Sequence, residues 1–180
     1  MLLLRHVLAF PAADVADMLG ISVAAVKSAL QRARGRIKDV APTAEDVIEP
    51  TEARARELLD QYITAFEQAD AEMLAEVLRH DAALEMAGSR TWFAGRTTCV
   101  PYIAAQVLGA PGEWAMVPIA ANRQPAAAAY HRDEDGTMRA FGIAVLDASA
   151  AGIARIVVFG DPGLVTLFGL PLVPDLLESP

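Results

Sequence analysis

Residues 11–37 read PAADVADMLGISVAAVKSALQRARGRI, and this stretch decides the fold of the amino-terminal part of the chain. Apolar residues recur every three or four positions on both sides of Gly20, which is typical of two helices joined by a short turn. Gly20 tolerates the left-handed backbone that such a turn needs. Ser22 is a good amino-terminal cap for the second helix. The stretch therefore predicts a helix-turn-helix.

The packing requirements of this motif are met where the two helices should touch. Ala16 is small enough to let the helices approach each other. Four apolar residues are expected to hold the helices at a fixed angle: Val15, Leu19, Ile21 and Val26. The second helix is expected to bury one stripe of apolar side chains. Its members are Val26, Ala29, Leu30, Ala33 and Ile37.

The opposite face of the second helix carries small, polar and basic side chains. Lys and Arg side chains reach phosphates or guanine edges in the major groove, and Gln pairs with an adenine edge. We expect DNA contacts from Ser22, Ala24, Lys27, Ser28, Gln31, Arg32, Arg34 and Arg36. A plain helical hairpin, whose basic residues only complement the helix dipole, would explain the charges. It would not explain why Ala16, Gly20 and Val26 are the residue types that a helix-turn-helix requires at their positions.

The charge of the chain is divided between its two parts. The 180 residues carry a net charge of −8, yet residues 1–40 sum to +3 and residues 41–180 to −11. Because phosphate attraction is screened beyond roughly 10 Å, the local charge of the first part matters more than the total. The single cysteine and three well-separated histidines exclude a disulfide framework and give no reason to expect a metal site.

Residues 39–51 hold two prolines and several acidic residues without a sustained period, which indicates a linker. A domain over 52–170 and a tail over 171–180 then follow. Helices are expected at Thr51–Ala69, Asp70–Arg79 and Thr98–Leu108. Beyond them, antiparallel strands are expected at Trp114–Ala121, Ala126–Arg132, Met138–Asp147 and Ile153–Gly160. Helices followed by a meander predict an α+β domain whose helices cover one face of a curled sheet.

The segment LLLRHVLAFPAADVADMLGISVAAVKSALQRARGRI (2–37) resembles region 4 of the extracytoplasmic-function (ECF) sigma factors of the sigma-70 family. The pattern V-x-S-x-L-x-R-A-R at Val26–Arg34 matches the family's recognition helix, which reads the promoter −35 element. The match is partial and covers residues 1–38. Region 2, which in the family binds the polymerase clamp and melts the −10 element, is expected to be absent. RNA polymerase core is therefore an expected partner only if region 2 precedes Met1.

Residues 52–170 resemble the cone-shaped fold shared by nuclear transport factor 2, the SnoaL polyketide cyclases and ketosteroid isomerase. The stretches TWFAGR (91–96), VPIAANRQPAAAAYHRDEDG (117–136) and FGDPGLVTLFGLP (159–171) resemble the carboxy-terminal extension of one sigma-factor subfamily. The resemblance implies an apolar pocket lined by Trp92, Tyr102, Trp114, Asn122, Tyr130, Phe141 and Phe159. The alternative is that these residues simply fill the cone.

Enzymes of this fold use a pocket carboxylate or histidine as a general base, and four residues are candidates here. Asp81 follows a predicted helix and would cap or turn the chain. Glu85 would lie on the wet face of a strand. His131 adjoins an acidic turn and would be solvated, and Asp161 would end a strand. No catalytic residue and no cofactor are assigned on this basis.

The expected function is promoter recognition and transcription initiation in the cytoplasm, with a regulatory or ligand-binding carboxy-terminal domain. The expected partner is promoter DNA, and no membrane association is expected. Two further partners stay open, namely a small molecule in the cone and a second copy of the chain. The alternative function is a SnoaL-like isomerase, cyclase or binder with a vestigial helix-turn-helix.

Overall fold

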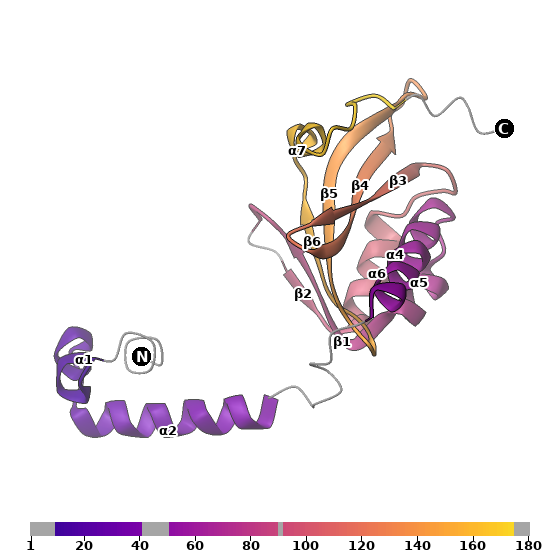
Figure 1. Ribbon diagram of the computed structural model, residues 1–180. Helices are drawn as coiled ribbons and strands as arrows, with labels where there is room; N and C mark the ends of the chain where they lie inside the picture. The colour runs from indigo at the N-terminus through magenta and orange to yellow at the C-terminus, as the bar shows by residue number, and fades with distance from the viewer. Residues whose placement is uncertain (1–9, 41–50, 90–91, 175–180) are drawn as a thin grey trace. The chain divides into compact units, whose positions relative to one another are not determined.

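The computed structural model describes residues 10–40, 51–89 and 92–174 (Figure 1). The chain divides into two compact units, one over 1–43 and one over 44–180. Most of the predicted linker lies outside the described residues. Its first two positions continue the second helix, which ends at Val40.

The first unit is a pair of helices, α1 (Ala12–Leu19) and α2 (Val23–Val40). Gly20 ends α1 with φ +64° and ψ +32°, and its N–H donates to carbonyls of the last turn. The Ala25 N–H donates to Ser22 Oγ at 3.1 Å, so Ser22 caps α2. The left-handed conformation of Gly20 and the Ser22 cap are both predicted from the sequence, and both are confirmed.

The core of this helix pair is smaller than predicted. Val15, Ala16, Val26 and Leu30 are buried together, with Phe10 and Ala12 packed against them. Leu19 and Ile21, which were predicted to hold the helices at their angle, are exposed. Two helices bury only the stripe along which they touch, so Leu19 and Ile21, which are off that line, remain in contact with solvent. The side chain of Ile37 lies outside the description.

The second unit is an α+β domain, as predicted. Three helices precede or interrupt the sheet, namely α4 (Glu52–Glu67), α5 (Ala71–Val77) and α6 (Arg96–Gln106). Thr51 Oγ1 caps α4 and Asp70 Oδ1 caps α5, the latter by accepting from two N–H groups at 2.9 Å. The strands are β1 (Leu78–Met86), β2 (Trp92–Ala94), β3 (Trp114–Ala121), β4 (Gln124–Arg132), β5 (Met138–Ser149) and β6 (Gly152–Phe159). A short helix, α7 (Pro162–Leu167), follows β6.

The six strands form one sheet in the order β2-β1-β6-β5-β4-β3. Strands β3 to β6 form the predicted antiparallel meander, whereas β1 pairs in parallel with β6. The helix predicted at Asp70–Arg79 is shorter than expected. The chain enters β1 at Leu78, whereas the prediction continued the helix to Arg79. The reason is pairing with β6, which Leu78 enters opposite Ile153.

Each face of the sheet has its own apolar cluster. Helices α4, α5 and α6 pack on one face around Leu58, Tyr62 and Leu74 (Figure 1). The other face packs against α7 through Val165. The chain beyond α7 is also held, because the carbonyls of Pro171 and Leu172 accept hydrogen bonds from the Tyr130 hydroxyl and the Ala140 N–H. The packed domain therefore extends past position 170, where the tail was predicted to begin.

Candidate functional sites

The exposed face of α2 is the first candidate site. All the predicted contact residues whose side chains are described lie in solvent on this helix or at its cap: Ser22, Ala24, Lys27, Ser28, Gln31 and Arg32. Their spacing of three and four positions places them on neighbouring turns of one helix face. The side chains of Arg34 and Arg36 lie outside the description. Within the described residues, Lys27 and Arg32 make no ion pair, which leaves both charges available to an anion.

The second candidate site is a cavity of about 340 Å³ between the sheet and helices α4 and α6. Its lining is mainly apolar and aromatic. The full set is Tyr62, Phe66, Leu84, Met86, Tyr102, Ile103, Gln106, Val107, Trp114, Met116, Ala129, His131, Phe141, Ile143, Ala144, Ile156 and Val158. Gln106 is exposed and also lines the cavity, so the cavity reaches the surface near the end of α6.

Three of the seven predicted pocket residues line this cavity, namely Tyr102, Trp114 and Phe141. Trp114 is held by a hydrogen bond from its Nε1–H to the Val107 carbonyl at 2.8 Å. Its ring meets Phe141 and His131 edge to face, with ring centroids 5.3 and 4.7 Å apart. Tyr102 stacks on Phe93 at 4.2 Å. An aromatic wall therefore borders the cavity from both the sheet and α6.

The other four predicted pocket residues lie elsewhere. Trp92 is exposed on the edge strand β2, and Phe159 is exposed at the end of β6. Asn122 occupies the turn between β3 and β4 with φ +51°. Tyr130 points to the opposite face of the sheet, where its hydroxyl donates to the Pro171 carbonyl at 2.9 Å. These positions correct the prediction. The sequence did not show which alternate side chains of each strand face the inside of the cone.

Phe141 reaches the cavity because β5 contains a bulge. The pairing of β4 with β5 slips between Ala129–Gly142 and Tyr130–Ala140, which leaves Phe141 without a partner. A bulge of this kind redirects one side chain, and here Phe141 joins the same cluster as Ala144. His131, predicted to be solvated, is also a cavity residue, because Tyr130 and His131 alternate across β4.

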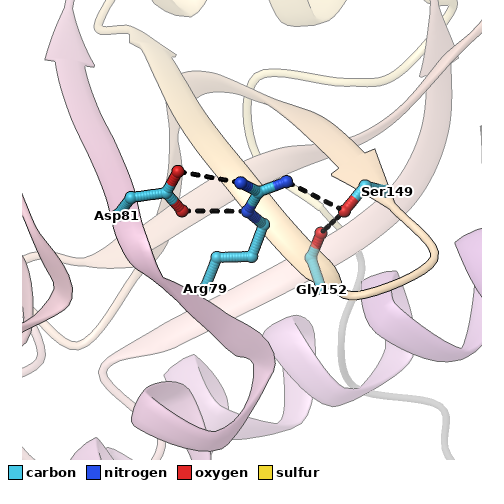
Figure 2. A network of polar contacts seen from close by, with 4 residues as sticks. All are labelled: Arg79, Asp81, Ser149 and Gly152. Atoms are coloured by element: carbon cyan, nitrogen blue, oxygen red, sulfur yellow. Dashed lines mark hydrogen bonds and ion pairs between the residues drawn. The ribbon is translucent and has the colours of Figure 1, made fainter. Parts of the chain in front are cut away.

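Asp81 is not a base in the cavity. The Arg79 guanidinium donates to both of its carboxylate oxygens, at 2.9 and 2.8 Å (Figure 2). Arg79 also donates to Ser149 Oγ at 3.5 Å, and that hydroxyl donates to the Gly152 carbonyl at 3.1 Å. The Arg79 hydrogen bonds hold the pKa of Asp81 below its ordinary value. Asp81 therefore has a structural role. It lies in strand β1 and pairs with Arg79, whereas the prediction placed it in a cap or turn after a helix.

The two remaining carboxylates are also occupied. Glu85 accepts from Arg155 at 3.4 Å, and Arg155 also donates to Asp147 at 3.2 Å. Asp161 lies beyond the end of β6 and caps α7 by accepting the Gly163 N–H at 2.8 Å. None of the described residues that line the cavity is Asp or Glu. Of the four candidate bases, only His131 borders the cavity.

Sequence reasoning missed two cavity residues on α4, Tyr62 and Phe66. Both were assigned to the apolar stripe of the helix, which is correct for their burial. Periodicity identifies the buried face of a helix but does not show whether that face meets packed side chains or a void.

In the described parts of the chain, no cluster of three or more His, Cys, Asp or Glu is placed to bind a metal, and no helix is long and apolar enough to cross a membrane.

Comparisons with known proteins agree with both halves of the structure. Residues 1–37 match the family model for sigma-70, region 4. The ECF RNA polymerase sigma factor SigG of Mycobacterium tuberculosis, strain H37Rv, is 40% identical over 172 residues. The aligned region is 94% of this chain and 46% of the relative. The chain thus spans about half the length of the curated relatives it matches.

The fold of the second unit matches solved structures at low identity. An NTF-2 like protein of unknown function from Burkholderia xenovorans LB400 gives a TM-score of 0.51 at 13% identity, covering 72% of this chain and 89% of that chain. A steroid delta-isomerase from Pseudomonas aeruginosa gives 0.51 at 18% identity, covering 67% and 90%. The resemblance to ECF sigma factors is confirmed as a similarity: residues 1–37 match sigma-70 region 4, most of the chain is similar to SigG, and the second unit has the nuclear transport factor 2-like fold.

Proposed function

We propose that the chain binds promoter DNA at the −35 element through the exposed face of α2 and takes part in transcription initiation. The observation that carries the proposal is the match of residues 1–37 to sigma-70 region 4, with a capped second helix whose outer face is fully exposed. Lys27 and Arg32 supply charge for phosphates or guanine edges, and Gln31 supplies an amide for adenine.

The test begins with a selection of binding sites from a random duplex library, because the sequence does not give the target. Fluorescence anisotropy with the selected duplex then compares the chain with Arg32→Ala. If Arg32 reads a base edge, the loss is about 1–3 kcal/mol and discrimination at one base position relaxes. If it contacts a phosphate, all duplexes bind more weakly and the slope of log affinity against log salt flattens by about one.

Arg56→Ala is the matched control for this experiment. Arg56 is an exposed arginine on α4, in the other unit, and its removal changes the net charge by the same amount. The control separates a contact made by α2 from a general loss of positive charge. An Arg32→Ala variant that keeps both its affinity and its salt slope would contradict the proposed interface.

The proposal extends to two partners and a compartment. RNA polymerase core is the partner that promoter recognition by a sigma factor requires, and the cytoplasm is where such a complex would act. A second copy of the chain would pack on the outer face of the sheet, where Val117, Ile119 and Val145 are only half-buried. Co-sedimentation with polymerase core and sedimentation equilibrium of the chain alone test the two partners separately.

The carboxy-terminal domain is proposed to be regulatory, and the cavity favours a ligand-binding role for it. An enzymatic role is less well supported, because three of the four candidate bases are occupied outside the cavity. A cavity volume of 340 Å³ falls at the lower end of the range of small-molecule sites, which is roughly 300–1,000 Å³.

A further inference from the structure

The lysines of this chain are confined to one helix. Of the fifteen basic residues, thirteen are arginines and two are lysines, Lys27 and Lys38, both of which belong to α2. Residues 41–180 contain no lysine. The two basic residue types differ in reactivity, because the lysine amine can be acylated whereas the arginine guanidinium stays protonated. A reagent that modifies lysine side chains can therefore change the charge of α2 without changing that of the second unit.

Lys27 is available to such a reagent. It is exposed on the outer face of α2, and within the described residues its ammonium makes no hydrogen bond or ion pair. Residues three and four positions away are its neighbours on the helix surface, and none of them is acidic: Val23, Ala24, Leu30 and Gln31. Lys27 lies in the second turn of α2, away from the carboxy-terminal end where a cation stabilises the helix dipole. We therefore expect the helix pair to fold without this charge.

The positive charge of α2 favours an anionic acyl donor. Arg32, Arg34 and Arg36 follow Lys27 on the same helix, and residues 1–40 sum to +3. Such a concentration of charge attracts small anions over a distance of about 10 Å at 0.1 M salt. Acetyl phosphate is a small anion that carries an activated acetyl group. The charge that attracts the phosphates of DNA therefore also attracts this donor.

We propose that Lys27 is a modification site, acetylated by an acyl phosphate, and that its acetylation weakens the binding of DNA to α2. The neutral Nζ attacks the carbonyl carbon of the acetyl group, a C–N bond forms, and the C–O bond to phosphate breaks. Phosphate leaves with the electron pair of that bond, and the proton lost by Nζ goes to solvent. The product is a neutral amide, so the cation is removed. The inference rests on the proposed function, because it names a regulation of the same DNA interface.

The size of the effect follows from the loss of one phosphate contact. Each such contact contributes about 0.9 to the slope of log affinity against log salt on B-DNA. At about 0.1 M salt this slope corresponds to a factor of roughly eight in affinity. Complete acetylation of Lys27 should therefore weaken binding about five- to tenfold and flatten the slope by about one.

The experiment treats the full chain with acetyl phosphate and maps the modified lysines by mass spectrometry of its peptides. Fluorescence anisotropy with the selected duplex measures the affinity before and after treatment, and circular dichroism should not change. Lys27→Arg carries a cation that cannot be acetylated, so treatment should leave its affinity at its own starting value. Lys38→Arg is the matched control, because it removes the other lysine of α2 and should lose as much affinity on treatment as the unaltered chain.

Three results would overturn the proposal. They are an unmodified Lys27, an acetylated Lys27 with unchanged affinity and salt slope, and a Lys27→Arg variant that loses as much affinity on treatment as Lys38→Arg. Peptide mapping involves no DNA, so it decides whether Lys27 is acetylated whatever the outcome of the duplex selection. Failure of the promoter proposal would instead appear as an untreated chain that selects no duplex.

Discussion

Replacement of Asp81 by Asn should destabilise the carboxy-terminal domain, because the buried charge of Arg79 would lose the Asp81 carboxylate. The Arg79 side chain is 6% exposed, and two of its nitrogens donate to the two oxygens of Asp81 (Figure 2). Removal of one partner of a fully buried ion pair costs roughly 3–5 kcal/mol. The Asp81 side chain is 51% exposed, so water can solvate the guanidinium from that side. We therefore expect a loss of about 1–2 kcal/mol, between the buried and the surface limits.

Urea unfolding followed by circular dichroism measures this loss. Glu57→Gln is the matched control, because the Glu57 side chain is 55% exposed and its partner Arg54 is 36% exposed. The two carboxylates are similarly solvated, and the difference lies in the burial of the arginine. The control should change the free energy of unfolding by less than about 0.5 kcal/mol. Equal losses in the two variants would refute the reasoning from burial.

The same pair predicts a dependence on pH. The Arg79 hydrogen bonds lower the pKa of folded Asp81 below that of the unfolded chain. A group with a depressed folded pKa contributes stability that is complete above its unfolded pKa, about 3.9 for Asp. That contribution is lost as the pH falls through the folded value. The gap between the chain and Asp81→Asn should thus be constant from about pH 5 to 8 and shrink in stronger acid. A gap as large at pH 3 as at pH 7 would contradict this.

Three further predictions concern single positions. Gly20→Ala should destabilise the helix pair by about 1 kcal/mol and reduce DNA affinity, because alanine is strained at a φ of +64°. No atom lies close enough to clash with the added methyl group, so the backbone strain is the whole cost. Circular dichroism measures the stability and fluorescence anisotropy the affinity. Arg123→Gly should stabilise the second domain by about 1 kcal/mol in urea unfolding, because Asn122 and Arg123 both have positive φ in a two-residue hairpin turn. Cys99 is buried with a raised pKa, so a thiol reagent should label it only on unfolding; rapid labelling of the native chain would contradict its placement.

Much of the fold could be predicted because its signals are local. Gly20 and Ser22 specify the turn and the start of α2, and Thr51 and Asp70 specify the caps of α4 and α5. Turn residues divide the meander, so strands β3 to β6 were placed to within about two residues. Side-chain caps and turn conformations depend on a few neighbouring residues, which a sequence displays directly.

The boundary of β1 could not be predicted because its cause is distant. Leu78 and Arg79 continue the periodic pattern of α5, and only pairing with Ile153, far along the chain, turns them into a strand. The irregular pairing between Leu78 and Ala83 adds to the difficulty. It places Arg79 beside Asp81 and Ser149, an arrangement that no local pattern contains.

The cavity was predicted in kind but not in composition. Residues 126–129 are all alanine, so β4 has no alternation of large and small side chains to set its phase. The prediction placed Tyr130 inside and His131 outside, and the structure reverses them. The bulge that turns Phe141 inward is set by pairing with β4, which the sequence of β5 alone does not reveal.

The partners of the arginines bear on the proposed function. In the second unit, most described arginines are already engaged: Arg54 and Arg79 in ion pairs, and Arg96 with the Ala75 and Leu78 carbonyls. Their charge is used to hold the domain together. Arg32 on α2 has no such partner among the described residues, although it is equally able to form one. Arg56 also has no such partner among the described residues, so what distinguishes Arg32 is its place on the same helix face as Lys27 and Gln31. The spacing along α2 fits the proposed contacts with the phosphates and base edges of a DNA groove.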